Sequence, residues 1–142
     1  MYQRILVPTD GSARSEQAAE HAIDLAAAFD ATVDALFVVE EAGRHWDMAV
    51  EKEEAVGEDA LDTVAELGEQ RGVPVERHLR RGQPAAEIVD AAADYSANLI
   101  VMGTQGRTGF SRIATAGSTT ERVVRLTAVP TLVIGGSEGN RE

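Results

Sequence analysis

Glycines, hydroxyl side chains and arginines gather in one stretch of the sequence, residues 99–124, LIVMGTQGRTGFSRIATAGSTTERVV. Two glycines follow an apolar run, and a Gly-Ser pair precedes a helix-like segment. Glycines let backbone N–H groups approach a phosphate without Cβ clashes, and a helix that begins at Ser118 adds unpaired N–H donors and a positive dipole end. This pattern predicts a clamp for a di- or triphosphate, formed by Gly103, Gly106, Gly117, Ser118 and Thr119.

The local charge agrees with an anionic ligand. Residues 103–125 hold four arginines (Arg107, Arg112, Arg122 and Arg125) against Glu121, a net charge of +3 in a chain whose net charge is −11. A second interpretation stays open, because Gly-x-x-Gly also forms ordinary turns and arginines near a helix end favour its dipole. Ser118 and Glu121 also fit a capping box that needs no ligand. The stretch is neither a Walker A motif nor a dinucleotide Gly-x-Gly-x-x-Gly after the first strand.

Composition excludes several classes of protein. The 142 residues contain no cysteine, which removes disulfides, thiolate catalysis and cysteine-ligated metals. No apolar run approaches the roughly 20 residues that span a membrane, and the N-terminus enters a strand-like run without a signal peptide. A net charge of −11 argues against general nucleic-acid binding, because phosphate backbones would be repelled. We therefore expect a cytoplasmic protein without membrane insertion.

The charged residues themselves are unusual. Lys52 is the single lysine among 13 basic residues, against 24 acidic ones. An acidic, arginine-rich surface is what we expect of a halophile, because at molar salt the Debye length falls to about 3 Å and self-repulsion costs little. The alternative is a GC-rich genome that encodes an ordinary acidic protein.

Apolar runs alternate with helical patterns along the whole chain. The runs predict strands at 4–10, 32–40, 73–79, 98–103 and 129–135, with helices at 11–30, 47–71, 83–96 and 118–126 between them. Ser12 is a candidate N-cap, and the first helix should bury Ala18, Ala22, Leu25, Ala26 and Phe29. This order is typical of an α/β fold with an open parallel sheet covered by helices on both faces. We expect one domain over 1–142, with a frayed tail at 136–142.

In such a sheet, ligands bind beyond the carboxyl ends of the strands. The residues there are Pro8, Thr9 and Asp10 after the first strand, Val38 near the end of the second, and Met102 and Gly103 at the end of the fourth. Asp10 can accept a hydrogen bond from a hydroxyl or amino group of a ligand, or it can cap the next helix. Val38 can line an apolar site for a nucleobase, or it can be an ordinary core residue. His21, His45 and His78 lack metal-ligand spacing, and no histidine near Ser118 supports a hydrolase triad.

Three segments together resemble the universal stress protein family: ILVPTDGS at the start, GTQGRTGFSRIATAGSTTERVVR near the end, and the last strand VPTLVIG. The glycine loop is similar to that of the nucleotide-binding branch. The resemblance implies five parallel strands in the order 3-2-1-4-5, Rossmann-like, with ATP (or ADP or AMP) in the cleft. It also implies a homodimer that forms through the last strand, Val129–Ile134.

Carried over by position, the resemblance implies a role for each site residue. Asp10, beside Pro8 and Thr9, would meet the ribose, and Val38 the adenine. Met102 and Gly103 would flank the ribose and the α-phosphate. Mg²⁺ or Mn²⁺ would be held through the phosphates, to which Gly106, Gly117, Ser118 and Thr119 would donate. Arg107, in the same loop, is a further candidate for nucleotide binding.

The sequence departs from the family pattern in the loop. Ten residues, RTGFSRIATA, separate Gly106 from Gly117, where the family has nine, and Gln105 stands where histidine is frequent. Three functions stay open. The first is a nucleotide-dependent regulatory protein read by a partner through 104–117 or 41–50. The second is a slow ATPase or phosphotransferase, with charge from Arg107 or Arg112 but no base beside the phosphates. The third is a structural or chaperone-like dimer without nucleotide.

Overall fold

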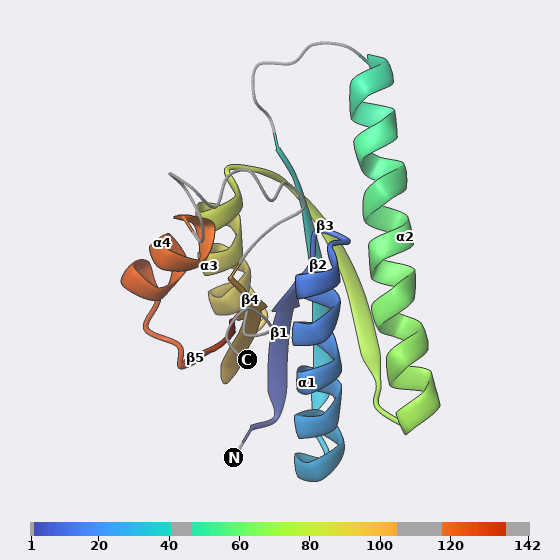
Figure 1. The fold of residues 1–142 in the computed structure, drawn as a ribbon. Helices are drawn as coiled ribbons and strands as arrows, with labels where there is room; N and C mark the ends of the chain where they lie inside the picture. Colours follow the sequence, from blue (N-terminus) through green and yellow to red (C-terminus); the bar gives the residue numbers. More distant parts are fainter. Residues whose placement is uncertain (1, 41–46, 105–117, 136–142) are drawn as a thin grey trace, which may run out of the picture.

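The computed structural model describes residues 2–40, 47–104 and 118–135 (Figure 1). Several sequence-based expectations lie outside these ranges: the first part, 41–46, of the proposed partner segment 41–50, the glycine loop with Gly106, Arg107 and Gly117, and the tail at 136–142. They therefore stay predictions. Everything that follows concerns the described residues.

In this part of the chain, five parallel strands form one sheet in the order β3-β2-β1-β4-β5, as predicted. The strands are β1 (Arg4–Pro8), β2 (Thr32–Glu40), β3 (Val75–Gly82), β4 (Leu99–Gly103) and β5 (Thr131–Ile134). The helices are α1 (Ala13–Phe29), α2 (Asp47–Arg71), α3 (Pro84–Asp94) and α4 (Ser118–Leu126). The chain order therefore reverses between β1 and β4, the position at which open α/β sheets bind ligands.

Helices cover both faces of the sheet, α1 and α2 on one side and α3 and α4 on the other (Figure 1). The alternation of strand side chains divides the core. Ile5, Val7 and Phe37 pack under α1 and α2, whereas Leu6 and Leu36 pack under α3 and α4. The helices approach closely where glycine allows it: a Cβ on Gly57 of α2 would stand 2.4 Å from the Phe37 ring.

The ends of α1 show why it forms where it does. Ser12 has extended backbone angles and its hydroxyl accepts from the backbone N–H of Ser15, which confirms the predicted N-cap. Ala18, Ala22 and Ala26 are buried as expected. Phe29 was expected inside but is 45% exposed, because it lies in the last turn, where its ring meets Tyr2 edge-on at 5.2 Å.

Four of the five strands have boundaries that differ from the sequence-based ones. β1 ends at Pro8: the Thr9 N–H still donates to the Leu36 carbonyl, but the Asp10 N–H turns away from the sheet to Ser15 Oγ. β5 begins two residues later than Val129. β3 runs on to Gly82 because its arginines pair with the covering helices: Arg77 with Asp62, Arg80 with Glu87, and Arg81 with Glu54. A charged run that resembles a loop in sequence is here an edge strand.

Candidate functional site

The candidate site lies beyond the carboxyl end of β1, where the chain order of the sheet reverses. We call this position, which β2 and β4 flank on either side, the notch. β1 and β2 stay in register to the pair Pro8–Leu36, and the Thr9 N–H then donates to the Leu36 carbonyl at 2.8 Å. β2 continues past this point to Glu40, paired on its other side with β3. The end of β4 at Gly103 bounds the notch opposite β2, since β4 is the other neighbour of β1.

The backbone of Val38 faces this notch. Hydrogen-bonding groups of a strand alternate in direction from residue to residue. Leu36 points its carbonyl toward β1, whereas Val33 bonds to the β3 side. Val38, two residues beyond Leu36, therefore presents its N–H and C=O toward the side on which β1 has already ended. A donor and an acceptor at strand spacing can read the edge of a planar heterocycle. The Val38 side chain is half-buried against the core under α3 and α4.

The turn after β1 uses its own N–H groups. The Asp10 N–H donates to Ser15 Oγ at 3.4 Å, the Gly11 N–H to Thr9 Oγ1 at 3.3 Å, and the Ser12 N–H to Asp10 Oδ1 at 2.9 Å. Gly11 has a φ of +85°, which glycine adopts without strain. Since these donors are engaged, the turn is not a phosphate cradle. The turn instead holds the half-buried Asp10 just beyond the carboxyl end of β1, with its Oδ1 on the Ser12 N–H.

The first turn of α4 is tied to the opposite wall of the notch. The Thr120 hydroxyl donates to the carbonyl oxygen of Gly103 at 2.7 Å, and Val123 is fully buried beneath the helix. These two contacts fix the N-terminal end of α4, with Ser118 and Thr119, near the end of β4. A helix N-terminus presents unpaired N–H donors and partial positive charge to an anion. Thr120 is a residue that the sequence analysis missed, although the GSTT run contains it.

The structure thus brings Asp10, Val38, Gly103 and the start of α4 to the carboxyl ends of adjacent strands. Other predicted site residues sit deeper. Pro8 and Thr9 are buried, and Met102 is 5% exposed within the core under α3 and α4. Contacts from these three would come from the backbone, because their side chains are enclosed.

A second polar cluster, also missed in the sequence, lies at the opposite end of the sheet. The Asp34 carboxylate on β2 is fully buried and accepts from Arg4 Nη2 at 2.6 Å and Arg4 Nε at 3.0 Å. His78 Nε2 lies 2.9 Å from Asp34 Oδ1, and the His78 ring stacks on Tyr95 at 4.1 Å. The hydrogen bonds to Asp34 raise the pKa of Arg4 above its ordinary value, so the guanidinium stays charged.

This cluster is an ion-pair network rather than a metal centre. Asp34, Glu76 and His78 place potential ligand atoms within 4.8 Å of one another. Arg4 Nη2 however already lies between Asp34 Oδ1 and Glu76 Oε1, at 2.6 and 3.2 Å. His78 is therefore a partner of a buried carboxylate, a role that the sequence analysis, which found no metal-ligand spacing for it, did not predict. The available signal was Asp34 itself, a charge within an apolar strand run.

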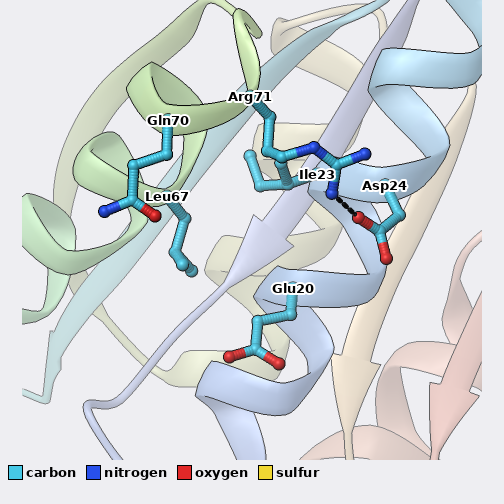
Figure 2. Close-up of a pocket in the computed structure, with 6 residues that line it drawn as sticks. All are labelled: Glu20, Ile23, Asp24, Leu67, Gln70 and Arg71. Carbon is cyan, nitrogen blue, oxygen red and sulfur yellow. Dashed lines mark hydrogen bonds and ion pairs between the residues drawn. The ribbon is translucent and has the colours of Figure 1, made fainter.

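A groove of about 280 Å³ lies between α1 and α2, outside the predicted site (Figure 2). Arg71 bonds to Asp24 across it. It contains none of the predicted site residues, and its apolar floor is partly covered by the polar side chains around it. Its lining is Glu20, Ile23, Asp24, Leu67, Gln70 and Arg71.

None of the helices in the described part of the chain combines the length and the apolar character that crossing a membrane requires. The fold defines a doubly wound α/β protein whose switch point lies between β1 and β4, the position at which open α/β sheets bind ligands. The model of the Universal stress protein family matches residues 1–135, and the chain belongs to this family.

Individual relatives agree with this assignment. A universal stress protein of Methanocaldococcus jannaschii is 41% identical over 141 residues, covering 94% of this chain and 82% of its own. The structure of UspA from Lactobacillus plantarum superposes with a TM-score of 0.84 at 27% identity, covering 94% and 97%. An Archaeoglobus fulgidus universal stress protein solved in complex with dAMP shares the fold, with a TM-score of 0.75 at 24% identity, covering 94% and 98%.

Proposed function

We propose that this protein is an ATP-binding universal stress protein that acts as a nucleotide-dependent regulatory module. The observation that carries the proposal is the notch above β1, which sets the Val38 backbone and the Asp10 carboxylate against an α4 N-terminus tied to Gly103. The base would lie against Val38, the ribose at Asp10, and the phosphates at Ser118 and Thr119. The dAMP complex of the A. fulgidus relative supports an adenine nucleotide as the ligand class.

The engaged N–H groups of the Asp10 turn support this orientation of the ligand. The backbone N–H groups of Asp10, Gly11 and Ser12 donate to acceptors within the turn. The side of the site formed by β1 and α1 therefore suits a nucleoside better than a phosphate. The α4 side has the opposite character, with a helix N-terminus and, in the sequence, the arginines of residues 103–125.

We expect a metal ion at this site to be coordinated mainly by the phosphates of the nucleotide, not by protein side chains. The described residues at the notch offer the single carboxylate of Asp10, with one oxygen already accepting from Ser12, rather than a converging set of ligands. Mg²⁺ or Mn²⁺ would therefore be coordinated by phosphate oxygens. We infer a binding role, with slow hydrolysis as the alternative.

Calorimetry with a ligand series tests the proposal. The wild type should bind ATP, and protein denatured after purification should release ATP or ADP for detection by mass spectrometry. Asp10→Ala should weaken adenosine, AMP and ATP alike, because it removes a contact to the nucleoside. Thr120→Val should weaken ATP more than adenosine, because it loosens the phosphate end only. No binding of adenine nucleotides at millimolar concentration, in low or molar KCl, would refute the proposal.

We also infer that the protein forms a homodimer through β5, as the resemblance implies. β5 is an edge strand whose Leu132 and Val133 are each 37% exposed, and the preceding α4 exposes Val124 and Leu126. The other edge, β3, is instead lined with paired arginines. An uncharged edge with exposed apolar side chains favours strand pairing with a second copy. A downstream partner that reads nucleotide occupancy completes this proposed role.

A further inference from the structure

Ser15 lies at the centre of the hydrogen bonds that shape the Asp10 turn. It belongs to the first turn of α1, is 5% exposed, and lies outside the set of residues expected to contact nucleotide. Its hydroxyl donates to the carbonyl oxygen of Ser12 at 3.0 Å and accepts from the Asp10 N–H at 3.4 Å. It also lies 3.1 Å from the buried hydroxyl of Thr9.

The direction of these hydrogen bonds follows from proton counting. A serine hydroxyl carries one proton, and Ser15 gives it to the Ser12 carbonyl, so the Thr9 hydroxyl is the donor in the contact with Ser15. Thr9 Oγ1 then has its lone pairs for the Gly11 N–H at 3.3 Å. A single buried oxygen on α1 thereby orients the backbone on both sides of Asp10.

The Asp10 carboxylate depends on this arrangement. Its Oδ1 accepts from the Ser12 N–H at 2.9 Å, and the carbonyl group of Ser12 is the one that Ser15 holds. Ser15 therefore contacts residues on both sides of Asp10, and it shares the Ser12 carbonyl with the N–H of Glu16. A buried and fully used hydroxyl network rigidifies the backbone it connects.

We propose that Ser15 is a positioning residue for nucleoside recognition, which acts by holding the Asp10 carboxylate toward the ribose. This inference rests on the proposed function. Ser15→Ala removes the acceptor for Thr9 and Asp10 and the donor to Ser12, so the turn gains freedom. ATP affinity should fall roughly three- to tenfold, the range for one lost hydrogen bond.

A double-mutant cycle distinguishes positioning from a general loss of stability. If Ser15 acts through Asp10, Ser15→Ala should weaken ATP binding in the wild type but add little once Asp10→Ala is present. The preference for ATP over 2′-deoxy-ATP should shrink in Ser15→Ala, because a misplaced carboxylate reads the ribose less well. Ser15→Cys keeps the shape of the side chain with a somewhat larger, weakly hydrogen-bonding sulfur, and should show the same losses if the alanine variant does not fold.

Asn98→Ala is the matched control. The Asn98 side chain accepts from the backbone N–H groups of Gln3 and Arg4, each at 2.7 Å, at the opposite end of the sheet. Its loss should lower stability while ATP affinity stays unchanged.

The outcomes separate the two proposals. If ATP binds and Asp10→Ala weakens it, but Ser15→Ala and Ser15→Cys leave affinity and ribose preference unchanged, or their effects add fully to that of Asp10→Ala, the role of Ser15 is refuted and the nucleotide site stands. If the wild type binds no adenine nucleotide, both proposals fall.

Discussion

Gly103 packs directly against Arg14 in the first turn of α1. A Cβ on Gly103 would stand 2.6 Å from Arg14 Cγ and 3.1 Å from the carbonyl oxygen of Arg14. The Arg14 guanidinium continues across the end of the sheet and donates to the carbonyl oxygen of Gly135 at 3.0 Å. The absence of a side chain at Gly103 is therefore required by the approach of α1, a reason separate from any contact with phosphate.

Gly103→Ala should consequently destabilise the protein even without nucleotide. The new methyl group forces Arg14 and the start of α1 away from β4, and overpacking of this kind costs roughly 1–3 kcal/mol. Arg14→Ala should restore part of the loss, because it removes Cγ but not the backbone carbonyl. Denaturant unfolding of the nucleotide-free variants measures both effects.

Gly135→Ala is the comparison for this prediction. Among the described residues, a Cβ there would meet only Thr104 Cγ2, at 4.0 Å, so the change in unfolding free energy should stay within about 0.5 kcal/mol. A Gly103→Ala variant as stable as Gly135→Ala would show that α1 does not depend on close contact with β4.

The buried Asp34 carboxylate supports a second prediction. Arg4→Met leaves Asp34, which is fully buried, without its cationic partner, and breaking such a pair costs on the order of 3 kcal/mol. Asp34→Asn should cost less, because the Arg4 side chain, 32% exposed, can turn toward Glu76 and water. In the Asp34→Asn background, Arg4→Met should therefore cost little more. Equal and additive losses, measured by urea unfolding, would contradict this account.

The sequence predicted the strands and helices of this protein but not the ion-pair cluster around Asp34. The alternation of apolar runs and helical patterns predicted each strand and helix, because local periodicity records which face of an element is buried. The link between Arg4, Asp34 and His78 depends instead on the register of three strands that are neighbours in space but separated along the chain. No local pattern carries that register.

The candidate site divides in the same way. Asp10 and Gly103 could be placed because they directly follow apolar runs, and parallel strands bring their carboxyl ends together. Ser15 and Thr120 could not, because a hydroxyl in the first turn of a helix looks like an ordinary cap residue. Their roles follow only from the partners that the fold gives them, Thr9 for Ser15 and the Gly103 carbonyl for Thr120.

Salt should stabilise the folded protein. The chain carries 24 acidic against 13 basic residues, and the excess charge repels itself more strongly when the chain is compact. Raising KCl from about 0.1 M to about 2 M shortens the Debye length from about 10 Å to below about 3 Å and should raise the thermal unfolding midpoint. This increase is the expected behaviour of a halophilic protein. A midpoint that falls steadily with KCl would instead mean that exposed pairs such as Arg77–Asp62 outweigh the repulsion.

The two edges of the sheet lead to the last prediction, which concerns assembly. The wild type should sediment as a dimer at micromolar concentration, through β5. Val133→Glu puts a carboxylate on that edge and should give a monomer with unchanged circular dichroism, because Val133 is already 37% exposed. Val56→Glu is a matched control, since Val56 is 36% exposed but lies on α2, which packs on β2 and β3 rather than on β5. A monomeric wild type, or a dimer that Val133→Glu leaves intact, would show that β5 is not the interface.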